Sequence, residues 1–232
     1  CHHWPMWGKE RVISFLKKQR DLYKFIHDQT LRLANKGFSK EEIAEQIKLP
    51  KSLSREFFNR DYYGTVHHNS KAVFVRYLGY FDGNPSTLYE RPPVERAIRY
   101  VEWMGGPAKI LEKARESFDS GDYRWTAEVL NHVVMADENH EEAKCLLADT
   151  LEQLGYQSES ATWRNFFLCG ALELREGLPP TRDFVPSSGM AAGIPIDQVF
   201  KTMAVRLLPD QVDGEIIQVG IDLTDDAPSV SY

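Results

Sequence analysis

The sequence predicts a mainly α-helical protein that ends in a small α+β unit, and three observations support this prediction. Apolar residues recur at helical spacing over most of the region 9–175. Capping residues, glycines and prolines divide that region into separate helices. Strand-like alternation of apolar and polar residues occurs near the C-terminus, over 215–223.

The first expected element is a long helix over 9–35. Its apolar residues follow one another at intervals of three, seven, three and seven positions, which keeps them near one face. They are Ile13, Leu16, Tyr23, Ile26 and Leu33. Gly37 then provides a C-terminal stop, because glycine readily adopts the backbone conformation that ends a helix.

A series of shorter elements follows this helix. Ser39 and Glu42 form a capping-box pattern, which predicts a short helix over 40–48 that ends before Pro50. The segments after it predict, in order, a short helix over 51–60, a loop over 61–69, an aromatic stretch over 74–81 that begins as helix, a turn at 83–86, and a helix from Pro92-Pro93 to about Met104.

The clearest internal signal is a spacing of 34 residues. Gly121-Asp122-Tyr123 recurs as Gly155-Tyr156, and two amphipathic segments lie between them, with a turn at 137–139. A helix–turn–helix unit of this length is typical of tetratricopeptide repeats. Flanking helices over 107–119 and 157–175 would complete a stack. One such unit cannot bury its apolar faces alone, so it must stack on neighbours or on another subunit.

The C-terminal part has a different composition. Residues 179–193 are rich in Pro, Ser and Gly and are expected to be a linker. A helix over 195–207 and a strand over 215–223 are expected after it. One strand is not stable alone, so the sheet of this α+β tail is expected to be truncated here. We also expect that both ends of the chain cut through a longer protein.

The composition excludes few functions. The net charge of -6 over 232 residues argues against a dedicated nucleic-acid binder. No stretch approaches the roughly 20 apolar residues of a membrane span. The three cysteines show no CxxC spacing and indicate neither a disulfide framework nor a metal knuckle. The cellular location stays undecided.

Two stretches contain residue types that could support chemistry. His2-His3-Trp4-Pro5 at the start of the chain suits metal ligation, because imidazole is a common metal ligand. No second ligand set is visible, so the other ligands would precede residue 1; ordinary polar residues are the alternative. The Tyr- and His-rich segment 62–69, followed by Tyr77 and Tyr80, could donate protons to a leaving oxygen. Its alternative role is packing of a loop.

Several stretches together resemble the alkyl sulfatases of the sodium dodecyl sulfate hydrolase type, in the metallo-β-lactamase superfamily. The stretches are His2–Gly8, Lys18–Asn35, Tyr63–Val73, Tyr77–Asp82, Gly121–Trp125, Leu154–Gln157 and Trp163–Asn165. The similarity is dense from residue 1 to about residue 177. The tail resembles the beginning of the sterol-carrier-protein-like domain of the same enzymes.

The resemblance implies hydrolysis of alkyl sulfate esters to alcohol and sulfate at a site with two zinc ions. His2 matches the family's last metal ligand best, and His3 is the alternative. His68 matches the histidine of the family's Ser-His-Asn motif. With Tyr80, it is expected to contact the sulfate ester and to protonate the leaving alkoxide. Position 67 is His where the family commonly has Ser, and Cys1 also stands where Ser is common.

The resemblance also implies a division into domains. Residues 1–35 would be the end of an αββα metallo-β-lactamase domain, and 36–178 a tetratricopeptide-like helical dimerisation domain that forms a homodimer. Residues 179–193 would be the linker, and 194–232 the start of a sterol-carrier-protein-like domain. Two other functions stay open: a non-catalytic tetratricopeptide-like interaction module, and another hydrolase of the superfamily.

Overall fold

The computed structural model describes residues 4–178, 193–212, 214, 216 and 218–220. The chain falls into two compact units, Cys1–Pro179 and Pro180–Tyr232. The described residues of both units form helices and turns and contain no β-strand, so the prediction of a mainly α-helical protein is confirmed. The expected division at residues 35 and 36, between a hydrolase domain and a dimerisation domain, stays a prediction.

The first helices of the larger unit pack around a small apolar core. They are α1 (Lys9–Ala34), α2 (Lys40–Gln46), α3 (Lys51–Ser54), the 3-10 turn η1 (Phe57–Asn59) and α4 (Val66–Leu78). Helix α4 packs against both α1 and α2. The core that they share consists of Leu33, Ile43, Ile47 and Phe74. The apolar face predicted for α1 therefore meets this core through its C-terminal half, while Ile13 and Leu16 are exposed.

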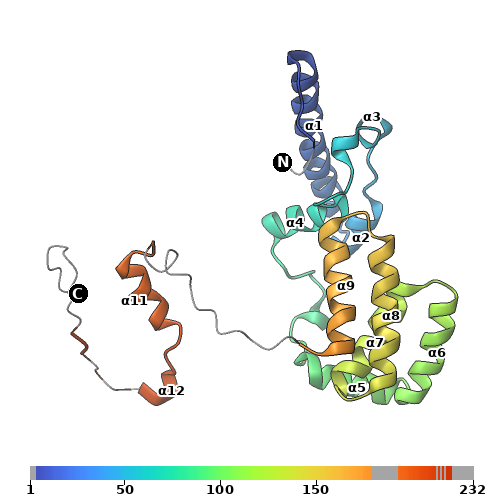
Figure 1. The fold of residues 1–232 in the computed structure, drawn as a ribbon, viewed down its shortest axis with the longest axis vertical. Helices are drawn as coiled ribbons and strands as arrows, with labels where there is room; N and C mark the ends of the chain where they lie inside the picture. The colour runs from blue at the N-terminus through green and yellow to red at the C-terminus, as the bar shows by residue number, and fades with distance from the viewer. Residues whose placement is uncertain (1–3, 179–192, 213, 215, 217, 221–232) are drawn as a thin grey trace. The chain divides into compact units, whose positions relative to one another are not determined.

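The next helices form a second layer around a larger core. They are the 3-10 turn η2 (Pro85–Thr87), α5 (Pro93–Trp103), α6 (Pro107–Asp119), α7 (Tyr123–Ala136), α8 (Glu141–Gln157) and α9 (Ala161–Glu176). Helix α7 packs against α5, α6 and α8, and α8 packs against α9, so that α7, α8 and α9 lie as successive neighbours (Figure 1). Leu130 and Ala143, which are fully buried, lie in this core.

The helix pair α7 and α8 agrees with the prediction, but the repeat of 34 residues does not. Gly121 precedes α7, with a φ of +83° that favours glycine. Gly155 instead lies within the last turn of α8, where a Cβ atom would meet Cδ2 of Leu168 at 2.9 Å. The two glycines therefore serve different purposes: one ends a turn, and the other allows α8 and α9 to approach closely.

The predicted loop over 61–69 is wrong in its second half. Thr65 is the N-cap of α4, and its hydroxyl accepts a hydrogen bond from the backbone N–H of His68. The cap satisfies a backbone N–H that would otherwise have no partner, so the helix begins at Val66. His67 and His68 consequently lie in the first helical turn rather than in a loop.

The described part of the smaller unit contains two helices, α11 (Ile196–Ala204) and α12 (Pro209–Val212). Helix α11 confirms the helix expected over 195–207. Of the strand expected over 215–223, residues 216 and 218–220 are described and have no strand geometry. The other residues of that segment, and the expected linker except residue 193, lie outside the described residues. The likeness of this tail to a sterol-carrier-protein-like domain stays a prediction.

No helix in the described part of the chain is long and apolar enough to cross a membrane. Helix α1 has 26 residues, which is sufficient length, but lysines, arginines and acidic residues recur along it. This finding agrees with the absence of an apolar stretch in the sequence.

Candidate functional site

The structure places two of the four predicted site residues. His68 lies in the first turn of α4, and Tyr80 lies two residues beyond the end of that helix. His68 and Leu78 are ten helical residues apart, which corresponds to about 15 Å along the axis. The two predicted catalytic residues thus lie at opposite ends of α4 and are not brought together. His2 and His3 lie outside the described residues.

His68 lies where the N-terminus of α4 meets the N-terminus of α9. Ser160 is the N-cap of α9, and its hydroxyl accepts from the backbone N–H of Trp163, at 3.4 Å. The same hydroxyl donates to the carbonyl oxygen of Tyr63 at 2.8 Å, just before α4. Ser160 is 2% exposed and Thr65, the N-cap of α4, is 5% exposed. Two buried caps therefore fix the first turns of both helices against each other.

The two helices are joined directly by a bond between side chains. The indole Nε1 of Trp163 donates to Nδ1 of His68 at 2.9 Å. The ring of Trp163 also meets the rings of both histidines nearly edge to face, with centroid distances of 5.4 Å to His67 and 5.5 Å to His68. Such T-shaped arrangements are favoured by aromatic quadrupoles. Trp163 thus holds His68 through Nδ1, and His68 as a whole is exposed.

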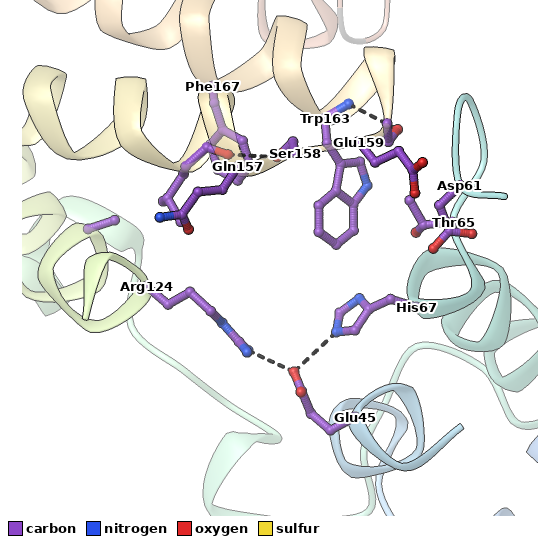
Figure 2. Close-up of a pocket in the computed structure, with 13 residues that line it drawn as sticks. Glu45, Asp61, Thr65, His67, Arg124, Gln157, Ser158, Glu159, Trp163 and Phe167 are labelled. Atoms are coloured by element: carbon purple, nitrogen blue, oxygen red, sulfur yellow. Dashed lines mark hydrogen bonds and ion pairs between the residues drawn. The ribbon is translucent and has the colours of Figure 1, made fainter. Parts of the chain in front are cut away.

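His67 makes different contacts from its neighbour. Its Nε2 lies 3.4 Å from Oε1 of Glu45, and the same oxygen accepts a hydrogen bond from Arg124 at 2.8 Å (Figure 2). Burial and then the charge of Lys71 lower the pKa of His67 below its ordinary value, although Glu45 opposes this. The hydrogen bond from Arg124 lowers the pKa of Glu45. The lowered pKa favours the neutral form of the His67 ring at pH 7.

A hollow of about 570 Å³ opens beside His67 between α2, α4, α7 and the α8–α9 turn. Figure 2 shows Trp163 on one side of it and Glu45 and Arg124 on another. Its charged lining residues are Glu45, Asp61, Glu159 and Arg124. Burial, and to a lesser extent the charge of Glu159, raise the pKa of Asp61, although the backbone N–H of Val66 opposes this. Because carboxylates outnumber cations, the hollow itself does not suit a sulfate group.

The segment before α4 adds further ties to α9. The backbone N–H of Ala161 donates to the carbonyl oxygen of Tyr62 at 2.8 Å, and Thr162 donates to that of Tyr63 at 2.9 Å. Arg60 forms an ion pair with Glu159 and lies over the ring of Tyr62 at 5.3 Å. Arg60 therefore helps to hold the segment before α4 against the segment that leads into α9.

Sequence reasoning missed most residues that hold His68 and His67 in place. Trp163 and Arg124 lie in stretches that carry the family resemblance, but nothing in those stretches connects them to the histidines, and Ser160 and Glu45 lie outside the stretches. Trp163 and His68 are 95 residues apart, so no local spacing connects them. The capping pattern of Ser160 could have been found, because serine is a preferred N-cap residue.

The described residues do not contain a metal centre of their own. No group of three or more His, Cys, Asp or Glu side chains within the described ranges could hold a metal ion. Zinc sites are built from three or four such ligands. His2 and His3 lie outside those ranges, so the fit of this chain to zinc is not decided by its described part.

Comparisons with known proteins agree on one family. The family model described as alkyl sulfatase dimerisation matches residues 39–177, which is more than half of the chain. A linear primary-alkylsulfatase from Pseudomonas sp is 52% identical over 226 residues, covering 97% of this chain and 33% of the relative. The alkyl/aryl-sulfatase BDS1 from Saccharomyces cerevisiae is 49% identical over 219 residues, covering 93% of this chain and 33% of the relative.

A solved structure shows the same fold. The stereoselective inverting sec-alkylsulfatase Pisa1 from Pseudomonas sp. is 45% identical, with a TM-score of 0.88, and the match covers 92% of this chain and 34% of that chain. The chain spans about a third of the length of the curated relatives it matches.

Proposed function

Because the chain belongs to the alkyl sulfatase dimerisation family, we propose that it works as part of an alkyl sulfatase. The reaction converts an alkyl sulfate ester and water into an alcohol, sulfate and a proton. The observation that carries this proposal is the 52% identity to a linear primary-alkylsulfatase over 97% of the chain. A second relative, at 46% identity, is named an (R)-specific secondary-alkylsulfatase, so the choice between primary and secondary esters stays open.

We assign the contact with the sulfate ester to His68. Its imidazole lies in the first turn of α4, at the positive end of the helix dipole, and the residue is exposed although Trp163 donates to its Nδ1. The N-terminus of a helix favours an anion such as a sulfate ester by electrostatics alone. A hydrogen bond from imidazole to an oxygen of the ester would stabilise negative charge that develops there. A role for Tyr80 in the same site stays a prediction.

We further propose that His2 or His3 is a ligand of a site for two zinc ions whose other ligands are not among the described residues. When bound, zinc supplies Lewis acidity and water that is acidic enough to attack near neutral pH. The proposal has a readout other than activity. In the complete polypeptide, replacement of the true ligand by alanine should lower the zinc content, and replacement of its neighbour should not. Equal zinc content in both variants would contradict it.

The helical region 39–177 is also proposed to form a homodimer, as the description of its family indicates. A chain of 26.7 kDa would then behave as a particle of twice that mass in light scattering. A mass that stays at the monomer value at all concentrations up to about 100 µM, far above the dissociation constants of stable assemblies, would exclude a stable dimer through this chain.

The experiment that tests the function measures sulfate release from dodecyl sulfate by the complete polypeptide that carries this chain. We expect turnover in the unchanged protein and a loss of about 100-fold or more in kcat for His68→Gln, which removes the imidazole. His132→Gln is the matched control, because His132 lies on α7 against Tyr100, away from the junction of α4 and α9. Zinc-loaded protein without turnover on alkyl sulfates would refute the proposal.

A further inference from the structure

We propose that Trp163 is a positioning residue that holds His68 as the neutral tautomer with its proton on Nε2. The inference rests on the proposed function, in which His68 meets the ester, and it adds the residue that fixes the direction of that contact. It also assigns His68 the role of a hydrogen-bond donor rather than a base.

The tautomer follows from the chemistry of the two rings. The indole N–H of Trp163 is a donor and has no lone pair to offer. Because Nδ1 of His68 lies 2.9 Å from it, Nδ1 must be the acceptor and must be unprotonated. The single proton of a neutral imidazole is then on Nε2.

Both partners of this bond are fixed before any substrate arrives. The backbone N–H groups of His68 and Trp163 each donate to the N-cap hydroxyl of their own helix, Thr65 and Ser160. Ser160 in turn donates to the carbonyl oxygen of Tyr63, which comes shortly before α4. Hydrogen bonds thus tie the first turns of α4 and α9 to each other. A contact held in this way needs no reorganisation when charge develops at the substrate.

The direction of the remaining proton decides what His68 can do. With its proton on Nε2, the ring offers a donor at the nitrogen that is not bonded to Trp163, and that nitrogen has no free lone pair to take a proton from water. Loss of that proton would leave an imidazolate, because Trp163 has no second proton to give. His68 therefore stabilises an ester oxygen by hydrogen bonding, as a neutral imidazole does when it polarises a carbonyl.

His67 shows that this arrangement is particular to His68. Both histidines lie in the same helical turn, and both meet the ring of Trp163. Yet Nε2 of His67 faces Glu45, and its Nδ1 is buried without a hydrogen-bond partner in the described structure. The ring of His67 therefore lines the hollow, whereas the indole N–H of Trp163 donates its hydrogen bond to His68.

The decisive experiment is ¹⁵N nuclear magnetic resonance on the chain labelled at its seven histidines. The signals of His68 are identified by their loss in His68→Gln. We expect Nδ1 to resonate as an unprotonated nitrogen and Nε2 as a protonated one. In Trp163→Phe, which keeps an aromatic ring but lacks the N–H, the two shifts should converge as both tautomers become populated. A protonated Nδ1 in the unchanged chain, or no change in Trp163→Phe, would overturn the proposal.

Kinetics of the complete polypeptide supply a second readout. Trp163→Phe should lower kcat on dodecyl sulfate by about tenfold with little change in KM, since a misdirected donor affects the transition state more than binding. Unchanged kcat with folded protein would also overturn the proposal. If Trp163→Phe does not fold, the tautomer of His68 measured in the unchanged chain alone tests the proposal. If the polypeptide does not hydrolyse alkyl sulfates, the tautomer result still stands, so the two failures are distinguishable.

Discussion

The indole nitrogen of Trp163 and Nδ1 of His68 lie 2.9 Å apart and connect two helices whose first turns face each other. Each residue is the third in its helix, and each donates its backbone N–H to the cap of that helix. The buried hydroxyl of Ser160 closes the arrangement by reaching the segment before α4. Stability and the candidate site therefore depend on the same few contacts.

Ser160→Ala should destabilise the chain by about 1–2 kcal/mol, because it removes an N-cap and a buried hydrogen bond to Tyr63. Thr162 still donates to the same carbonyl, which limits the loss. Urea denaturation followed by circular dichroism gives the free energy of unfolding. Ser120→Ala, at an exposed helix end, serves as the control and should change it by less than about 0.5 kcal/mol. Equal effects of the two changes would refute the role given to Ser160.

Gly155→Ala should destabilise the chain by about 1 kcal/mol, even though alanine is the better helix former. A Cβ atom there would meet Leu168 at 2.9 Å for Cδ2 and 3.0 Å for Cγ, and overpacking of this kind costs more than the helix gains. In the background of Leu168→Ala these two contacts are removed and only Cβ of Phe167, at 3.4 Å, stays close, so the same change should cost much less. The measurement is a double-mutant cycle in urea, and an equal cost in both backgrounds would contradict close packing of α8 on α9.

The free energy of unfolding should fall as the pH is lowered from 7.5 to 5, in part because of His67. Burial lowers the pKa of this residue in the folded chain below its ordinary value of 6.5. The unfolded chain then binds a proton at a higher pH than the folded chain, so stability is lost as the pH falls through 6.5 toward the folded-state pKa. His67→Gln should show a flatter profile over this range. A slope equal to that of the unchanged chain would rule out the assigned burial.

Leu130→Ala should cost about 2–5 kcal/mol, because Leu130 is fully buried in the core between α7 and its neighbours. Leu172→Ala is the control, because Leu172 is 53% exposed on α9. This change should lower the free energy of unfolding much less. Thermal unfolding by calorimetry distinguishes the two. A similar loss in both variants would mean that the described core is not the one that stabilises the protein.

Local signals in the sequence predicted much of the helical architecture. The helix over 107–119 has the predicted bounds, because Gly105-Gly106 and Pro107 mark its start and Gly121 marks its end. The sequence does not reveal the start of α4, because Thr65 caps it without the Glu or Gln at the third helical position that makes a capping box recognisable. The spacing of the glycines also gives a wrong prediction. Gly155 resembles the turn residue Gly121 in sequence, yet it lies where α8 packs closely on α9.

The candidate site was predictable in part. The family resemblance predicts a role for His68, and the structure places this residue, exposed, at the start of a helix. Its partner Trp163 was not predictable, because a contact over 95 residues depends on how two layers of helices meet. The same holds for Glu45 and Arg124, which are 79 residues apart and share one hydrogen bond. Such contacts are tertiary and leave no periodic trace in the sequence.

The central claim is that Trp163 acts on the ester through His68, and a double-mutant cycle in kcat on dodecyl sulfate tests it most directly. In the complete polypeptide, Trp163→Phe should lower kcat by about tenfold when His68 is present. In the background of His68→Gln, the same change should have no further effect, because nothing remains for the indole to orient. A further tenfold loss in that background would contradict the account.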